Sequence, residues 1–199
     1  MIRRLRERLR LVHAVTGEGR GIARRYLVVN GFDGALTMVG IIAGFYLAPT
    51  VELTVVISAC LGAAVALGVS GVSGALISET AEQRRALTEL EGAMLTDLTD
   101  SAHGLAARLL PPFIALINGG SPFFIAVLII TPLWLAHMGV ALPLGALETA
   151  LLTALAILFA LGVYLGKVAG RPLWRAGIQT LVIATVTLVL VTLVNAGGT

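Results

Sequence analysis

Five long apolar segments constrain this 199-residue chain more than any other feature of its sequence. Each has about the twenty residues that an α-helix needs to cross the hydrocarbon core of a bilayer. They are residues 26–47, 51–77, 111–136, 144–166 and 173–194. The chain is 57% hydrophobic and only 13% charged, about half the charged fraction that is usual for a soluble domain. We therefore predict an all-α integral membrane protein with five transmembrane helices.

The fourteen lysine and arginine residues indicate how these helices are oriented. All of them fall in three places, which are residues 1–25, 78–109 and 167–175. With five spans these places share one side of the membrane, and the positive-inside rule makes that side the cytoplasm. We expect a cytoplasmic N-terminus and a C-terminus outside. The same distribution explains the pI of about 9.6 without nucleic acid as a partner.

The order of polar and apolar stretches predicts four parts of the chain. Residues 1–25 form a basic arm whose apolar residues recur at helical spacing, which is typical of an amphipathic helix at a membrane surface. Residues 26–77 hold the first two transmembrane helices, and residues 110–199 hold the last three. Between them, residues 78–109 form a short acidic helical segment, which we expect on the cytoplasmic side.

Asp33 lies near the start of the first apolar segment, flanked by apolar residues. A carboxylate inside a bilayer costs on the order of a few kcal/mol, so it normally faces a bundle interior or a water path. On an ideal helix Asn30, Asp33 and Thr37 share one face with Gly40 and Gly44, and the two glycines form a GxxxG pattern that lets helices approach closely. We expect a cation path along Asn30, Asp33 and Thr37. The alternative is a buried acid that is satisfied by a neighbouring group.

Small residues shape the expected surroundings of this face. Gly31 and Gly34 are expected to leave room for water or an ion beside Asp33. The second apolar segment is rich in small residues, which permit either close helix packing or a narrow polar passage beside Ser70. In the third segment, residues 118–122 are expected to unwind the helix and free backbone carbonyls.

Residues 78–103 are predicted to continue the second helix beyond the membrane. At 100° per residue, five acidic residues of this stretch fall within roughly an 80° arc. These residues are Glu79, Glu82, Glu89, Asp97 and Asp100. Carboxylates grouped in this way suit oxygen-preferring divalent cations such as Mn²⁺, Mg²⁺ and Fe²⁺. A solvated charged face is the other interpretation of the same pattern.

Motifs of enzymes are absent from the sequence. It contains no P-loop, nucleophile elbow, zinc-protease motif or dinucleotide fingerprint. The one cysteine, Cys60, excludes an internal disulfide framework and a metal site built from several cysteines of one chain. We predict no enzymatic activity and no resident cofactor.

The chain resembles the vacuolar iron transporters of plants and their yeast relative, which carries iron and manganese into the vacuole. The resemblance covers most of the chain from about Asn30. In the first span it rests on Asn30-x-x-Asp33-Gly34 followed by Gly40 and Gly44. In the second span it rests on the small residues that run into Ser78-Glu79. Further on it rests on residues 120–123 and 131–133, and on Arg175 at the start of the fifth span.

This resemblance implies a homodimer whose cation path runs between the two first spans and exchanges Fe²⁺ or a similar ion for protons. Asp33 matches the first-span acid of the family. Glu79, Glu82 and Glu89 look like the start of the family's cytoplasmic metal-binding carboxylates. The family's second span commonly carries an acid and a methionine, where this chain has the neighbourhood of Cys60. That cysteine is either a soft metal ligand or a small apolar residue.

We therefore expect a homodimeric transporter that exports Fe²⁺ and/or Mn²⁺ from the cytoplasm by proton antiport. The expected location is a prokaryotic plasma membrane. One alternative is a proton-coupled exporter of a non-metal cation, which has no use for the acidic residues after the second span. Another is a membrane interaction or assembly protein without transport activity, in which Asp33 only bonds to a neighbour.

Overall fold

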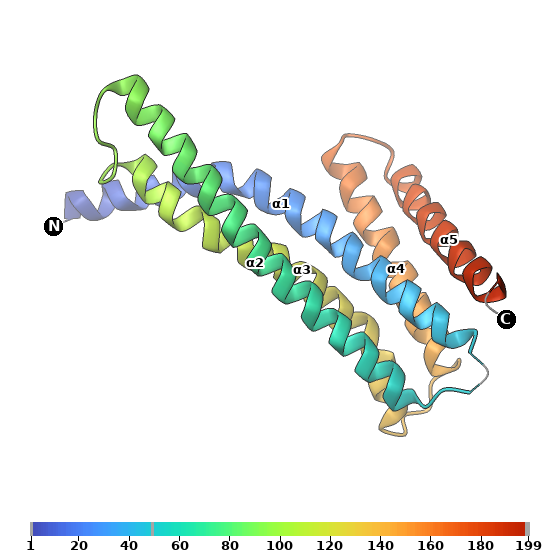
Figure 1. Ribbon diagram of the computed structural model, residues 1–199. Helices are drawn as coiled ribbons and strands as arrows, with labels where there is room; N and C mark the ends of the chain where they lie inside the picture. Colours follow the sequence, from blue (N-terminus) through green and yellow to red (C-terminus); the bar gives the residue numbers. More distant parts are fainter. Residues whose placement is uncertain (1, 49, 198–199) are drawn as a thin grey trace. The chain divides into compact units, whose positions relative to one another are not determined.

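The computed structural model describes residues 2–48 and 50–197, which form five α-helices (Figure 1). The helices are α1 (Ile2–Tyr46), α2 (Leu53–Met94), α3 (Ala102–His137), α4 (Ala146–Val168) and α5 (Leu173–Gly197). Each is long and apolar enough to cross a membrane, and in α1 the apolar part is Gly21–Tyr46. The described residues contain no strand. These findings confirm the predicted all-α fold with five transmembrane helices.

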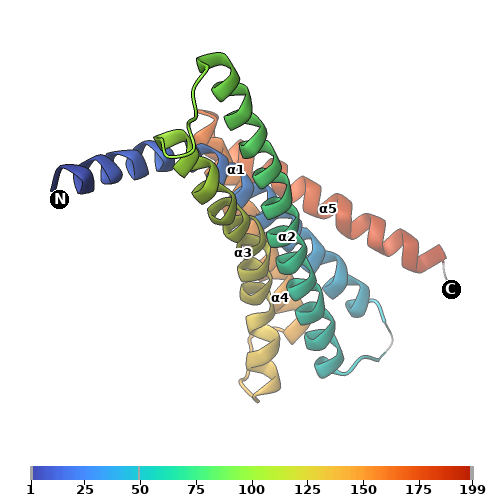
Figure 2. The ribbon, with the colours of Figure 1, turned by 60° about the vertical axis from the view of Figure 1, so that its left-hand side comes forward.

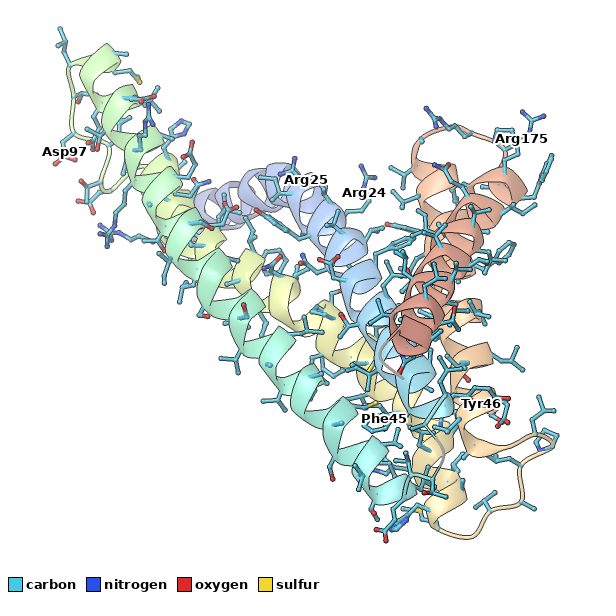
Figure 3. The ribbon with its side chains drawn as sticks, turned by 45° about the vertical axis from the view of Figure 1, so that its right-hand side comes forward. Arg24, Arg25, Phe45, Tyr46, Asp97 and Arg175 are labelled. Carbon is cyan, nitrogen blue, oxygen red and sulfur yellow. The ribbon has the colours of Figure 1, made fainter. Side chains whose placement is uncertain are left out.

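Helices α1, α2 and α3 are longer than a bilayer requires. Helix α2 has 42 residues, which at 1.5 Å per residue make about 63 Å, against about 30 Å for a hydrocarbon core. Its polar second half therefore continues as helix beyond the apolar segment. The basic arm is also helical, because α1 runs without interruption from Ile2 to Tyr46. In Figure 3, Arg24 and Arg25 stand at one end of the apolar part of α1, and Phe45 and Tyr46 stand at the other end.

The prediction that the second helix runs on to His103 is wrong beyond Met94. Leu95 adopts a left-handed backbone conformation with a φ of 50°, and this ends α2. The hydroxyl of Ser101 then accepts hydrogen bonds from the amides of His103 and Gly104, at 3.1 and 3.3 Å. These bonds cap the first turn of α3. Asp97 consequently lies in the loop between the two helices (Figure 3).

The prediction that residues 118–122 unwind the third span is also wrong, because α3 is continuous through them. Pro122 has no backbone N–H, so one carbonyl of the preceding helical turn loses its hydrogen-bond donor. Membrane helices tolerate a proline where neighbouring helices accommodate such a carbonyl. Here α2 packs closely against α3. The side-chain amide of Asn118 donates a hydrogen bond to the carbonyl of Gly71 at 2.8 Å. A Cβ atom on Gly71 would lie only 2.7 Å from the Cα of Gly119.

The helices form two compact units, and α1, α2 and α3 contribute to both. The first unit contains residues 2–27 and 69–120. In it the second half of α2 and the first half of α3 run side by side in opposite directions, and a loop joins them (Figures 1 and 2). The second unit contains residues 28–68 and 121–197, which include all of α4 and α5.

An apolar core holds the second unit together. Each of α1 to α4 buries a stripe of side chains spaced three or four residues apart, as expected for one face of a helix. Met38, Cys60, Ile130 and Leu158 are fully buried members of the four stripes. Large apolar side chains outside this core are widely exposed, as expected for a protein whose surface faces lipid.

Helix α5 packs on α4 through small residues (Figure 1). The hydroxyl of buried Thr180 donates a hydrogen bond to the carbonyl of Leu158 at 2.9 Å. A Cβ atom on Gly162 would lie 2.5 Å from the Thr180 methyl, and one on Gly177 would strike the ring of Phe159. The glycines thus let the two backbones approach closely, which is how many membrane helices associate.

Candidate cation site

The face of α1 that carries Asp33 is open in the second unit. Asp33 is exposed, and its carboxylate makes no hydrogen bond or ion pair with the described residues. The hydroxyl of half-buried Thr37 donates a hydrogen bond to the backbone carbonyl of Asp33 at 2.6 Å. Asn30 is also half-buried, one turn earlier. The three residues therefore share a face of α1, as the sequence predicts, and only the carboxylate is fully open.

The opposite side of α1 is tightly packed. A Cβ atom on Gly34 would lie 2.7 Å from the Cα of Pro122 and 2.8 Å from its carbonyl oxygen. One on Gly31 would lie 2.7 Å from a terminal carbon of Ile125. The expectation that these glycines leave room for water or an ion is therefore wrong, because α3 fills the space. Their physical role is close packing of α1 on α3, which turns Asp33 outward.

Two further glycines of α1 lie on the open face. A Cβ atom on Gly40 or on Gly44 would meet nothing within 4 Å. On an ideal helix both fall within about 20° of Asp33, because seven and eleven residues are close to whole numbers of turns. The open face of α1 thus carries a carboxylate without a partner among the described residues and, in the following two to three turns, two glycines without side chains.

Cys60 and Ser70 stand in different environments from Asp33. Cys60 has no exposed surface and lies in the apolar core of the second unit, among side chains such as Met38. It therefore packs as a small apolar residue in this structure. Ser70 is exposed in the first unit, and its backbone carbonyl accepts a hydrogen bond from Ser73.

Three of the five predicted acidic residues lie on α2 beyond its apolar segment. Glu79 accepts a hydrogen bond from the hydroxyl of Tyr26 at 2.9 Å, which ties α2 to α1 in the first unit. Glu82 is exposed. Glu89 is exposed and forms an ion pair with Arg85 at 2.9 Å. Because of these contacts, Glu82 is the one of the three whose carboxylate has no partner among the described side chains.

The other two acidic residues, Asp97 and Asp100, belong to the loop that precedes α3. The end of α2 at Met94 removes both from the helical arc that the sequence predicts. Asp97 is fixed locally, since hydrogen bonds from the hydroxyl and then the amide of Thr99 lower its pKa below the ordinary value. The loop therefore carries a carboxylate that stays ionised at neutral pH.

The described residues of a single chain bring no three histidine, cysteine, aspartate or glutamate side chains together as a metal-binding group. Sequence reasoning also missed Tyr26 as a partner of Glu79. The two residues are 53 positions apart on different helices, and no spacing pattern links them. The only available signal was the position of Tyr26 at the start of an apolar segment, where tyrosine often sits with its hydroxyl toward water.

Comparison with known proteins finds similarity to a protein whose function is not assigned. No family model matches the chain, and no solved structure matches it. An uncharacterized protein of the archaeon Methanocaldococcus jannaschii is 29% identical over 182 residues, which cover 90% of this chain and 90% of that protein. The similarity therefore extends over nearly the whole length of both proteins, and the likeness to vacuolar iron transporters rests on the motifs quoted above.

Proposed function

We propose that this protein is a homodimeric transporter that exports a divalent metal cation, Fe²⁺ and/or Mn²⁺, from the cytoplasm in exchange for protons. The observation that carries the proposal is the uncovered carboxylate of Asp33 on a helix that is apolar enough to span a membrane. Insertion scales put the cost of a charged side chain at a helix centre at about 2.5–3.5 kcal/mol, so such a group needs a partner or water. Nothing in a single chain supplies that partner among the described residues.

A second copy supplies what the open face lacks. If two α1 helices meet along Gly40 and Gly44, the small residues allow close contact, and the two Asp33 carboxylates come to face one another. Asn30 and Thr37 would add neutral oxygen ligands beside them. Such a set suits hard or borderline divalent cations, and the same carboxylates can take up protons when the metal leaves.

The basic residues support an orientation in which the N-terminus is cytoplasmic and the C-terminus lies outside. In that orientation the second half of α2 projects into the cytoplasm. Glu79, Glu82 and Glu89 on this helix, with Asp97 and Asp100 in the following loop, would raise the local concentration of metal ions. A prokaryotic plasma membrane is the expected location, with which an archaeal relative agrees.

The test is metal transport by the full chain in proteoliposomes that contain a pH dye. We expect Fe²⁺ or Mn²⁺ entry coupled to proton exit in the wild type. In Asp33→Asn both signals should fall to the level of empty liposomes, because the neutral amide can neither balance the charge of the metal nor carry a proton. Glu148→Gln is the matched control, since it also neutralises a single acid on a membrane-spanning helix of the second unit, and it should retain transport.

Two results would contradict the proposal. One is the absence of flux for every divalent metal tested with folded, dimeric wild-type protein. That is the result expected of a membrane interaction protein without transport activity. The other is equal transport by Asp33→Asn and the wild type, which would mean that the Asp33 carboxylate carries neither metal nor proton. Loss of transport in Glu148→Gln as well would show that the assay reports general damage to the protein.

A second candidate function keeps the proton coupling and changes the cargo to a non-metal cation. It is favoured by the absence of a three-ligand metal group within the described part of one chain, because a monovalent organic cation needs only one carboxylate. The same proteoliposomes distinguish the two functions. An organic-cation carrier would move protons with such a cation and would ignore Fe²⁺ and Mn²⁺.

A further inference from the structure

A cavity of about 500 Å³ lies in the first unit, between the second half of α2 and the first half of α3. This volume falls within the range of roughly 300–1,000 Å³ that is typical of sites for small molecules. Leu76, Thr80 and Arg84 recur every four residues along one face of α2 and line one wall. Arg108 and Pro111 line the facing wall on α3. A neighbouring hollow of about 340 Å³ shares the three residues of α2.

The lining changes from apolar to cationic along the cavity. Leu76 and Pro111 lie at the ends of the apolar segments of their helices, where the membrane boundary is expected. Arg84 follows Leu76 by eight residues, or about 12 Å along the helix, and Arg108 precedes Pro111 by about 4.5 Å. Thus both guanidinium groups belong at the level of lipid headgroups, and the apolar end of the cavity points toward the hydrocarbon.

The guanidinium groups of the two cavity arginines have no anionic partner among the described residues. Neither the guanidinium group of Arg84 nor that of Arg108 forms an ion pair or a hydrogen bond with the described residues, and no acidic side chain lines the cavity. Arg85 differs from its neighbour in both respects, because it pairs with Glu89 at 2.9 Å and does not line the cavity. Two unpaired guanidiniums that face one cavity are a complement for a phosphate group, which each can bind through two parallel hydrogen bonds.

We propose that this cavity binds an anionic phospholipid, with its phosphate between Arg84 and Arg108 and an acyl chain along Leu76 and Pro111. The hydroxyl of Thr80, which also lines the cavity, would donate a further hydrogen bond to the headgroup. The apolar end selects a lipid over a free phosphate, since only a lipid occupies both ends of the cavity. Basic pockets between helices at the cytoplasmic side of a membrane commonly bind such headgroups. This inference does not depend on the transport function.

Native mass spectrometry of the full chain in neutral detergent, titrated with phosphatidylglycerol, tests the proposal. We expect specific binding of phosphatidylglycerol in preference to phosphatidylcholine. Replacing both arginines in the double variant Arg84→Gln and Arg108→Gln should weaken this binding tenfold or more. Each single variant, Arg84→Gln or Arg108→Gln, should weaken it as well. Arg85→Gln is the control for these single variants, because it also removes one positive charge, one residue away from Arg84 and outside the cavity, and it should change the affinity less than twofold.

A second variant tests the cavity rather than its charge. Ala107→Trp fills the space between α2 and α3 while both arginines remain, so it should also weaken phosphatidylglycerol binding, with folding checked by circular dichroism. Unchanged affinity in this folded variant or in the double arginine variant would overturn the proposal. An equal loss in Arg85→Gln would do so too, because it would reveal diffuse charge attraction. Equally tight, arginine-dependent binding of glycerol phosphate would overturn the lipid as the ligand.

Discussion

Single residues of α1 decide which of its sides meets the protein and which stays open. Gly31 and Gly34 allow α3 to approach so closely that Pro122 and Ile125 occupy the positions that side chains would take. Asp33 lies between these two glycines in sequence but points to the other side, where it is exposed and no described residue pairs with it. The openness of the carboxylate is therefore a consequence of how tightly its neighbours pack.

We predict that Gly34→Ala destabilises the protein by about 1–3 kcal/mol, as is usual for overpacking. The added methyl group would lie within 3 Å of backbone atoms of Pro122, which a rotamer change cannot move aside. Gly62→Ala on α2 is the control, because its methyl group would meet nothing within 4 Å. Thermal unfolding in detergent should give a lower midpoint for Gly34→Ala alone. Equal midpoints for the two variants would mean that the contact with Pro122 does not constrain α1.

At the scale of helices, hydropathy predicts where membrane-spanning elements lie but not where they end in water. The five apolar segments were predictable because a bilayer demands long apolar runs. The end of α2 at Met94 was not predictable, because the residue with a left-handed backbone conformation that ends the helix is Leu95 and not the usual glycine. The loop is then held by a contact back to the end of α2, in which the amide of Leu98 donates a hydrogen bond to the side chain of Glu91 at 2.9 Å.

The same limit applies to the candidate site. Asp33 could be predicted from its isolation in an apolar segment, because the cost of burying a charge is a local property of the sequence. Two other features depend on which helices pack against each other, and this is not a local property of the sequence. They are the hydrogen bond from Tyr26 to Glu79 and the cavity lined by Arg84 and Arg108. In the sequence those two arginines indicate only which side of the membrane is basic.

We predict that Ser101→Ala frays the start of α3 and costs about 1 kcal/mol, the usual loss for an N-cap. The amides of His103 and Gly104 lose the hydroxyl that accepts their hydrogen bonds. Hydrogen–deuterium exchange should accelerate at the peptide that contains them. Thr96→Ala in the same loop serves as the control, because its hydroxyl makes no hydrogen bond with the described residues. Unchanged exchange in Ser101→Ala would show that the cap does not hold this end of the helix.

For the whole molecule, five membrane crossings place the two ends of the chain on opposite sides of the bilayer. From the distribution of lysine and arginine we expect one of the two possible orientations, with the N-terminus in the cytoplasm. The loop between α2 and α3 should be cytoplasmic, and the loop between α3 and α4 should lie outside. The route by which metal ions would leave the cell in the proposed function depends on this orientation.

We predict that an impermeant maleimide labels Val140→Cys in intact cells and labels Thr96→Cys only after the membrane is opened. Both positions are exposed in loops that adjoin α3. The natural Cys60 is fully buried, so the wild type should stay unlabelled and provides the blank. The reverse pattern would mean the opposite orientation, and labelling of both variants in intact cells would mean that the chain inserts both ways.

The fit between α4 and α5 also bears on how the protein is made. A chain leaves the ribosome from its N-terminus, so α4 reaches the membrane before α5. By then α4 already presents Gly162 and the carbonyl of Leu158 that Thr180 will use, and only residues 169–172 separate the two helices. Helix α5 therefore enters the bilayer beside a partner that is already in place.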